Sequence, residues 1–251
     1  MQTVAAFIKQ KFQQLIAQCL PARCLMCELS SNDKLICKHC QRALLEARTC
    51  CQRCGLGLNL SLPFCGDCLK KAHLFEKLHA LGSYQPPYSQ MVKKLKYTKK
   101  LLYGELLGEL LTKSIRLNLS AQQISAVDYL LPVPLHTEKL RCRGFNQATI
   151  IAKVIAKRLS TPLLLEGVER HISTMPQEGL RLYDRKKNLN GAFSISPSVQ
   201  QEIIGAYIVI IDDVVTTGAT VNSLCHTLLE AGVQRIDIWC ISRTSLTIQK
   251  S

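Results

Sequence analysis

The sequence predicts an α/β protein in which a parallel sheet flanked by helices follows a small cysteine-rich module. Two observations predict the sheet: an apolar run at 208–211 leads through a polar turn into a helical pattern, and a second strand-loop-helix unit covers 127–159. Continuous apolar runs are typical of parallel strands, because helices cover both faces of such a sheet. The third observation is a set of four Cys-x-x-Cys pairs between residues 24 and 68. We predict three parts, which are an amphipathic helix at 1–20, a double zinc ribbon at 21–72 and the α/β domain at 73–251.

The N-terminal segment has the pattern of an amphipathic helix and lacks that of an export signal. Apolar residues recur at helical spacing between Val4 and Cys19, while Lys9 and Lys11 interrupt any continuous apolar stretch. No transmembrane segment is expected, because nothing elsewhere is apolar over the length of a bilayer span. We therefore expect a cytoplasmic protein. The helix packs on its own protein, or alternatively lies on a partner or on the inner face of the cytoplasmic membrane.

Eight of the 13 cysteines follow a repeated metal-ligand pattern. Nine residues separate the first two Cys-x-x-Cys pairs and ten separate the last two. Thiolates at such a spacing hold a tetrahedral Zn²⁺ ion, which takes four of them. We predict two structural Zn²⁺ ions, each shared by consecutive pairs. The ligands are Cys24, Cys27, Cys37 and Cys40 for the first ion, and Cys51, Cys54, Cys65 and Cys68 for the second.

Two alternatives to this zinc assignment remain open. A single Zn²⁺ ion leaves the other cysteines buried or free. His39 lies inside the second pair and Cys50 beside the third, so either residue can replace one ligand. Disulfides are not expected in the reducing cytoplasm.

The α/β domain begins with a strand at 77–84 and a turn at Pro86-Pro87, followed by a lysine-rich segment at 88–97 and a leucine-rich helix at 101–117. Lysines and tyrosines alternate in this region. Cations can follow a single-stranded nucleic acid backbone while its bases stack on aromatic rings. A solvated helix face over a leucine core is the alternative. The candidate DNA-binding residues are Lys93, Lys94, Lys96, Tyr97, Lys99 and Lys100.

The next unit is a strand at 127–133, a basic loop at 135–147, and a helix for which Asn146 is the expected N-cap. Loops after parallel strands open at one sheet edge, so cations of this loop can meet a pyrophosphate bound at the other turn. Arginine suits that role because its planar fork binds two phosphate oxygens. The basic stretch at 166–193 is expected to be a mobile loop over the site, or else an exposed connection. The pyrophosphate-side candidates are His136, Lys139, Arg141, Arg143 and Arg185.

The most informative segment is 208–220, where the apolar strand ends at Asp212 and Asp213. A turn containing Gly218 lets the backbone approach a ligand, and apolar spacing predicts a helix from near Thr220. The first amides of a helix bind phosphate, and carboxylates at the end of a strand accept hydrogen bonds from ribose hydroxyls. An ordinary strand, turn and helix is the alternative. The candidate sugar-phosphate residues are Asp212, Asp213, Val214, Val215, Thr216, Thr217, Gly218, Ala219 and Thr220.

This segment resembles the phosphoribosyl pyrophosphate (PRPP) loop of type I phosphoribosyltransferases, and the whole chain resembles the ComF family of bacterial competence and DNA-utilisation proteins. The resemblance implies a type I phosphoribosyltransferase-like domain behind a zinc finger, and a role in handling incoming single-stranded DNA. Cys50 and the lysines at 186–187 depart from the family pattern. The motifs that carry the resemblance are the cysteine pairs, Leu95-Lys96-Tyr97, Val133-Pro134-Leu135-His136, Arg143-Gly144-Phe145-Asn146-Gln147, Arg170, Thr174, Gln177, Arg185, Asn188 and Gly191-Ala192-Phe193.

The net charge of +14 agrees with a polyanionic partner. We predict a competence-associated protein that handles single-stranded DNA in natural transformation, carries a PRPP-type site, and has competence or DNA-translocation proteins as further partners. Adjacent carboxylates suit a cis-diol, so PRPP or a ribonucleotide is expected in the loop, with DNA bound elsewhere.

One alternative is an active phosphoribosyltransferase that transfers the phosphoribosyl group of PRPP to a nitrogen nucleophile, with Mg²⁺ at the carboxylates and pyrophosphate. No catalytic residue is assigned, because positioning and charge stabilisation supply most of such catalysis. A second alternative is a regulator that senses PRPP through two conformations.

Overall fold

The computed structural model describes residues 22–31, 35–58, 62–171 and 191–244. The predicted N-terminal helix and residues 172–190 of the basic stretch, including Arg185, lie outside the described residues. The chain divides into two compact units, Met1–Glu46 and Ala47–Ser251. The second cysteine cluster thus belongs to the same unit as the sheet, and the boundaries at 20/21 and 72/73 stay predictions.

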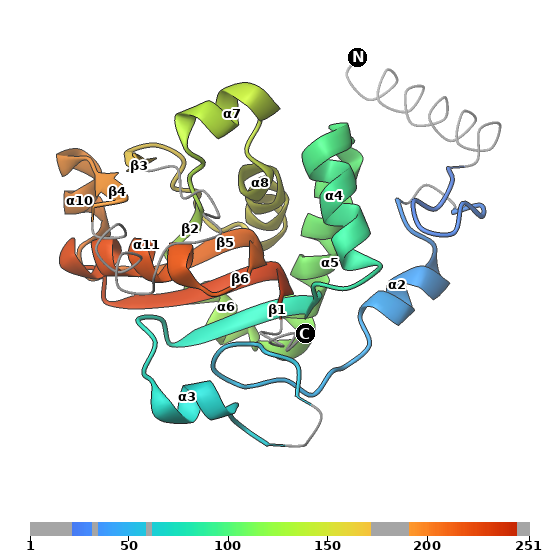
Figure 1. Ribbon diagram of the computed structural model, residues 1–251, viewed down its shortest axis with the longest axis horizontal. Coiled ribbons are helices and arrows are strands. Elements are labelled where there is room, and N and C mark those ends of the chain that lie inside the picture. Colours follow the sequence, from blue (N-terminus) through green and yellow to red (C-terminus); the bar gives the residue numbers. More distant parts are fainter. Residues whose placement is uncertain (1–21, 32–34, 59–61, 172–190, 245–251) are drawn as a thin grey trace, which may run out of the picture. The chain divides into compact units, whose positions relative to one another are not determined.

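A four-stranded parallel sheet forms the centre of the second unit, as predicted (Figure 1). The strand order is β1-β6-β5-β2. Three strands match the sequence expectations, whereas no element was predicted for β6, although Ile236–Ile241 is buried throughout. The strands are β1 (Lys77–Ser83), β2 (Tyr129–Pro132), β5 (Tyr207–Val215) and β6 (Arg235–Arg243).

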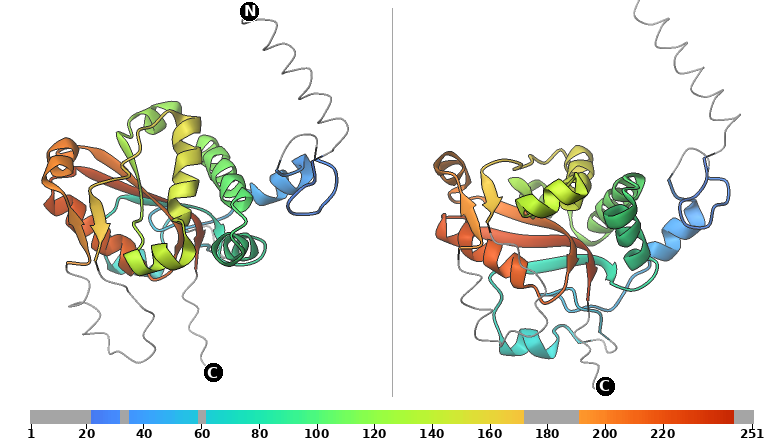
Figure 2. Two further views of the ribbon diagram at one scale, coloured as in Figure 1. Left: turned by 90° about the horizontal axis from the view of Figure 1, so that it is seen from above. Right: turned by 45° about the horizontal axis from the view of Figure 1, so that its top comes forward.

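Helices cover both faces of this sheet (Figure 2). Helices α5 and α8 pack against one face of the sheet, and α4 lies beside α5. Helix α11 covers the other face, where its apolar residues share a core with Ile208, Ile210 and Ile238. Burial on both faces explains the continuous apolar runs from which the strands were predicted. The helices are α4 (Tyr88–Thr98), α5 (Leu102–Asn118), α6 (Ala121–Ser125), α7 (Thr137–Arg143), α8 (Gln147–Leu159), α10 (Pro197–Ile203) and α11 (Ala219–Glu230).

Helices α5 and α8 approach closely because two glycines of α5 face α8. A Cβ atom at Gly104 would lie 2.7 Å from Cγ2 of Ile150, and one at Gly108 would lie 2.7 Å from Cβ of Val154. These separations are shorter than carbon atoms tolerate, so the packing requires glycine at both positions.

Three short elements differ from the sequence expectations. The basic loop after β2 contains α7, and the stretch 166–193 begins and ends in an antiparallel pair, β3 (Val168–Arg170) and β4 (Phe193–Ile195). All three elements are too short for their periodicity to be recognised in the sequence. Within the described part of the chain, no helix has the length and apolar character needed to cross a bilayer.

Candidate functional site

The predicted polar turn lies at the carboxyl end of β5. The strand ends at Val215, and α11 begins at Ala219 after Gly218, whose φ is 81°. A side chain at this left-handed position would be strained, which explains the glycine. The hydroxyl of Thr217 accepts from the amide of Ala219 at 3.3 Å. The strand, turn and helix are therefore present as predicted, and the helix begins one residue before Thr220.

The two adjacent carboxylates have different surroundings, because successive side chains of a strand point to opposite faces. Asp213 is 3% exposed and faces the α4 and α8 side, where it forms an ion pair with Lys96 and accepts from Gln147 at 3.1 Å. Asp212 is only half-buried and lies beside Cys240 on the α11 side. Asp213 is thus already paired within the domain, whereas Asp212 keeps part of its surface accessible; that both hold the sugar stays a prediction.

Asp212 also has a perturbed acidity. Burial and the nearby charge of Asp213 raise the pKa of Asp212 to about 8, although Lys96 opposes this effect. One oxygen of Asp212 accepts from the backbone amide of Asp213 at 2.8 Å. A carboxyl group that is protonated near neutral pH can both donate to and accept from a sugar hydroxyl.

Basic side chains gather at the same edge of the sheet. Burial lowers the pKa of Lys139, and the charges of Arg170, Arg143 and Lys96 lower it further. Burial also lowers the pKa of Arg170, while the charge of Asp212 opposes that shift. Lys139, Arg143 and Arg170 therefore lie near enough to Lys96 and Asp212 for their charges to interact, and such a group of cations suits a pyrophosphate.

The remaining pyrophosphate-side candidates differ in role. His136 is the N-cap of α7: its Nδ1 accepts from the amide of Glu138 at 3.3 Å, and its Nε2 lies 3.1 Å from the carbonyl oxygen of His171. These contacts tie the basic loop to the end of β3. Arg141 is exposed on α7, and Arg185 is outside the described residues.

Three residues near the site were not among the sequence-predicted site residues. Gln147 connects Asp213 with Arg143, from which it accepts a hydrogen bond. Arg170 joins the cationic cluster, and Arg243 at the end of β6 donates to the carbonyl oxygen of Val215 at 3.1 Å. Gln147 and Arg170 do lie within the family motifs, so their positions in those motifs were a usable signal.

The structure separates the candidate DNA-binding residues, which lie on α4 and just after it, into two groups. Lys96 points to Asp213 and keeps 19% of its side chain exposed. The hydroxyl of Tyr103 accepts from Lys94 at 3.0 Å, and Tyr97 is 74% exposed. The others, Lys93, Lys99 and Lys100, are exposed as well. Lys96 is thus a neighbour of Asp213, while the residues around it on the chain present cations and an aromatic ring to solvent.

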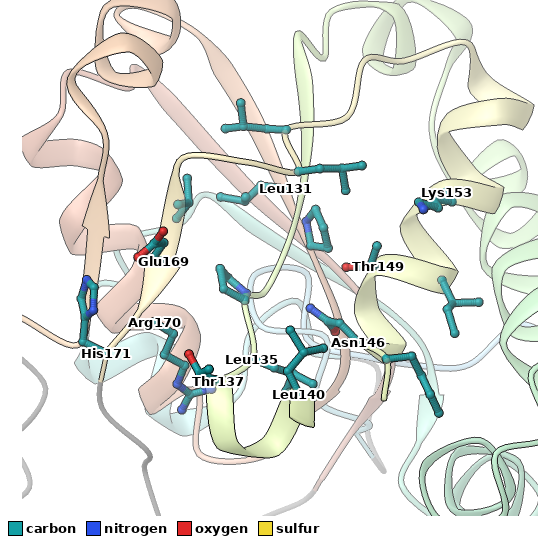
Figure 3. A pocket seen from close by; sticks show the side chains of 17 residues that line it. Leu131, Leu135, Thr137, Leu140, Asn146, Thr149, Lys153, Glu169, Arg170 and His171 are labelled. Atoms are coloured by element: carbon teal, nitrogen blue, oxygen red, sulfur yellow. The ribbon is translucent and has the colours of Figure 1, made fainter. Parts of the chain in front are cut away.

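A cavity of about 580 Å³ lies beside this site (Figure 3). Its lining comes from β2, α7, α8, β3 and the loops beside them, and it combines apolar walls with Lys153, Glu169 and Arg170. Arg170 therefore borders the cavity and also acts on Asp212.

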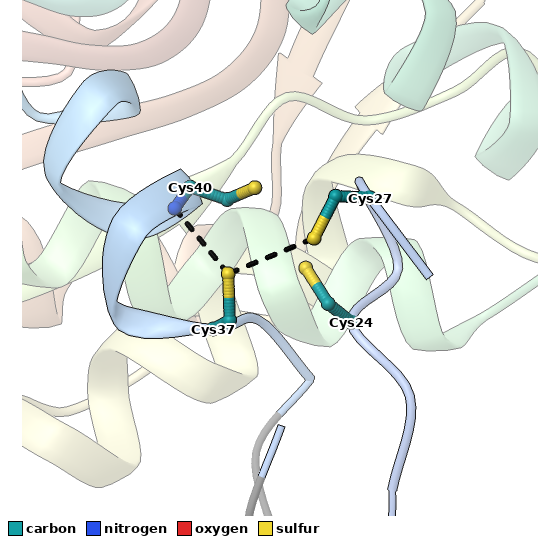
Figure 4. Close-up of side chains that lie close together, drawn as sticks. All are labelled: Cys24, Cys27, Cys37 and Cys40. Atoms are coloured by element: carbon teal, nitrogen blue, oxygen red, sulfur yellow. Dashed lines mark hydrogen bonds between the residues drawn. The ribbon is translucent and has the colours of Figure 1, made fainter. Parts of the chain in front are cut away.

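The eight predicted zinc ligands form two groups of four, and the pairing of consecutive Cys-x-x-Cys motifs is as predicted. Within each group, all sulfur atoms lie within 4.8 Å of one another. In the described part of the chain, neither His39 nor Cys50 belongs to these groups. Figure 4 shows the first group, in which the sulfurs of Cys27 and Cys37 are 3.7 Å apart.

Backbone amides point at sulfur in both groups. Burial alone would raise the pKa of Cys24, but the amides of Met26, Cys27 and Cys37 lower it to about 6. The pKa of Cys51 is likewise lowered to about 6 by the amides of Arg53, Cys54 and Cys65, against the effect of burial. Amides that stabilise thiolates, together with four converging sulfurs, fit a structural Zn²⁺ ion.

The two groups differ in burial. In the first, Cys24 is buried and Cys27 is exposed, whereas all four cysteines of the second are buried. The second group has an additional neighbour, since Nε2 of His73 lies 3.3 Å from the sulfur of Cys68. It is also joined to the sheet, because the amide of Leu78 donates to the carbonyl oxygen of Arg53 at 2.7 Å.

Comparisons with known proteins agree with these features. Residues 146–245 match the family model described as phosphoribosyl transferase domain. The DNA utilization protein YhgH of Salmonella typhimurium is 33% identical over 228 residues, which cover 90% of this chain and 98% of the relative. Competence protein F of Haemophilus influenzae is 30% identical over 223 residues, which cover 88% of this chain and 96% of the relative. Competence protein ComFC of Bacillus subtilis is 32% identical over 106 residues, which cover 41% of this chain and 39% of the relative.

Proposed function

This chain belongs to the ComF family, and on that premise we propose that it is a competence-related protein that handles single-stranded DNA and holds PRPP or a related phosphoribosyl ligand. The observation that carries the proposal is the meeting of three features at one sheet edge. These are the turn into α11, the carboxyl of Asp212 and the cluster of Lys139, Arg143 and Arg170. Together they offer complementary contacts to a phosphate, a ribose hydroxyl and a pyrophosphate.

Each part of the ligand has a partner of suitable chemistry. The amides at the start of α11 and the hydroxyls of Thr216 and Thr217 hold the 5-phosphate. Asp212 exchanges hydrogen bonds with a ribose hydroxyl. The cationic cluster neutralises the pyrophosphate, on which Mg²⁺ would supply further positive charge when bound.

Calorimetric titration of the zinc-loaded protein with PRPP tests this assignment. We expect the wild-type protein to bind, and Asp212→Ala to weaken binding by about tenfold, because the carboxyl group that exchanges hydrogen bonds with the ribose is removed. Glu230→Ala is the matched control, because Glu230 lies at the opposite end of α11. Absence of PRPP binding by the wild-type protein would overturn the assignment.

For DNA, we propose the exposed side of α4 together with the two lysines that follow this helix. Lys93, Lys94, Lys99 and Lys100 supply cations and Tyr97 an aromatic surface, which together suit a single strand. The chain's net positive charge supports this role. The protein is expected to act in the cytoplasm, together with other proteins of DNA translocation.

Transfer of the phosphoribosyl group is a second candidate, which the clustering of Lys139, Arg143 and Arg170 favours. These cations can stabilise the pyrophosphate that leaves when a nitrogen nucleophile attacks the anomeric carbon and the bond to pyrophosphate breaks. Measuring pyrophosphate release from PRPP with each nucleobase in turn tests this activity. If no base supports release, binding alone is the function. PRPP sensing would instead appear as a change in DNA affinity on adding PRPP.

We also propose that each cysteine group holds one structural Zn²⁺ ion. Such small segments have little apolar core, so metal binding supplies much of their folding free energy. Zinc analysis of the purified protein should give two ions per chain, and Cys51→Ser should remove one of them.

A further inference from the structure

The motif Leu95-Lys96-Tyr97 contains a lysine that differs from its neighbours on α4. Its ammonium group pairs with Oδ2 of Asp213, and the two side chains are 19% and 4% exposed. The other oxygen of Asp213 accepts from Nε2 of Gln147 at 3.1 Å. Arg143 donates to the oxygen of that same amide, so the NH₂ group of Gln147 is held toward the carboxylate. One oxygen of Asp213 thus accepts a hydrogen bond from α8, and the other forms an ion pair with α4.

This arrangement bears on the Mg²⁺ ion expected at the twin carboxylates. A magnesium ion requires ligand oxygens at about 2.0–2.1 Å in near-octahedral geometry, and it keeps several waters. At Asp213 an ammonium and an amide already lie against the two oxygens. A divalent ion at this carboxylate would also stand beside a buried positive charge, which repels it strongly in a low-dielectric site. Asp213 therefore does not fit the role of a magnesium ligand.

We propose that Lys96 is the resident cation of the phosphoribosyl site, where it neutralises Asp213 in place of a divalent metal ion. This inference rests on the proposed function, and it assigns Lys96 a positioning role. The sugar phosphate then contacts Asp212 and the turn at 216–220, with no metal on Asp213. Any Mg²⁺ that accompanies PRPP is carried by its pyrophosphate.

Binding of Mn²⁺ by the zinc-loaded protein without sugar tests the first part of the inference. We expect wild-type protein and Asp213→Asn to bind Mn²⁺ equally, because Asp213 contributes no ligand. Lys96→Met should gain a Mn²⁺ site that electron paramagnetic resonance detects, and the charge-balanced double variant Lys96→Met, Asp213→Asn should lack it. Lys93→Met, an exposed lysine of the same helix, is the matched control.

Two results of this experiment would overturn the inference. One is a Mn²⁺ site in the wild-type protein that Asp213→Asn abolishes. The other is a folded Lys96→Met protein that gains no site. If Lys96→Met alone fails to fold, the comparison of wild type with Asp213→Asn still decides the matter.

Titration with ribose 5-phosphate, which has no pyrophosphate to carry a metal, tests the second part. The buffer is freed of metal on a chelating resin, because a soluble chelator would compete for the structural Zn²⁺. We expect wild-type affinity to change by less than about twofold when Mg²⁺ is added. Lys96→Met should bind about tenfold more weakly without Mg²⁺ and recover part of this loss with it.

Wild-type binding that requires Mg²⁺ would overturn the inference. If the wild-type protein binds neither ribose 5-phosphate nor PRPP, the proposed function fails. The Mn²⁺ experiment still decides whether Lys96 excludes a metal from Asp213, so the two failures are distinguishable.

Discussion

Asn146 joins the end of β2 to the start of α8. Its Nδ2 donates to the carbonyl oxygen of Val133 at 2.9 Å, and its Oδ1 accepts from the amide of Ala148 at 2.9 Å. The same side chain therefore caps a helix and holds the basic loop at the sheet edge. Because α8 also carries Gln147, this connection positions the neighbours of Asp213.

Asn146→Ala should lower the free energy of unfolding by about 1–2 kcal/mol, since a helix cap and a half-buried hydrogen bond are both removed. Urea denaturation measures this change. Asn118→Ala is the control, because Asn118 is exposed and its side chain donates only to Ser114 within α5. Equal effects of the two substitutions would contradict the role given to Asn146.

The close approach of α5 and α8 gives a second prediction. Gly108→Ala should destabilise the protein by about 1–3 kcal/mol, because the new methyl group would lie 2.7 Å from Cβ of Val154. Thermal unfolding detects the change. Gly66→Ala is the matched control in a helix, since a methyl group there meets nothing within 4 Å. A Gly108→Ala protein as stable as Gly66→Ala would show that the helices can separate at little cost.

Asp212 predicts a pH dependence of stability. Its pKa of about 8 in the folded protein lies above the ordinary value near 3.8. Between these two pH values the folded state holds a proton on Asp212 that the unfolded chain has released. The protonated carboxyl therefore contributes its full stabilisation below about pH 4, and this contribution is lost as the pH rises to about 8. Replacing Asp212 by Asn, which cannot ionise, should make stability fall less between these limits.

Urea denaturation across this pH range measures the effect, with Glu230→Gln as the reference. Parallel curves for wild type and Asp212→Asn would contradict the raised pKa of Asp212.

The second cysteine group predicts a role for His73. Its Nε2 lies 3.3 Å from the sulfur of Cys68, and its ring stacks on Phe75 with centroids 4.7 Å apart. A ring N–H held against a thiolate strengthens a zinc site, so His73→Ala should speed zinc loss to a chromogenic chelator by about tenfold. His39→Ala is the control, because His39 is exposed on α2 (Lys38–Leu44). Similar rates in both variants would exclude this contribution.

The exposed side of α4 predicts the salt dependence of DNA binding. Replacing Lys93 and Lys99 by Ala should weaken binding of single-stranded DNA and reduce the slope of log affinity against log salt by about 0.7 for each phosphate that a lysine no longer neutralises. Fluorescence anisotropy at several salt concentrations measures the slope. Alanine at Lys153 and Lys157 of α8 provides a control of equal charge change. An unaltered slope in the α4 variant would place the DNA elsewhere.

Much of the architecture follows from local pattern. The apolar run before Asp212, the glycine at 218 and the cap at Asn146 each act within a few residues, so they were predictable. The pairing of the cysteines follows equally from their short spacing. Strand β6 was missed because four of its nine residues are charged or polar, and no carboxylate pair or glycine turn follows its apolar residues.

The contacts that give the site its chemistry depend on segments far apart in the chain. Sequence alone placed Lys96 among its exposed neighbours, yet the packing of α4 turns this lysine toward Asp213. Alternation along β5 then separates the two acids, so that Asp213 pairs with Lys96 while Asp212 stays half-buried on the other face. Local residue preferences identify strands, turns and metal-ligand spacings because those interactions are short-range. The pairing of opposite charges, such as Lys96 with Asp213, is decided only when helices from distant parts of the chain pack on one sheet.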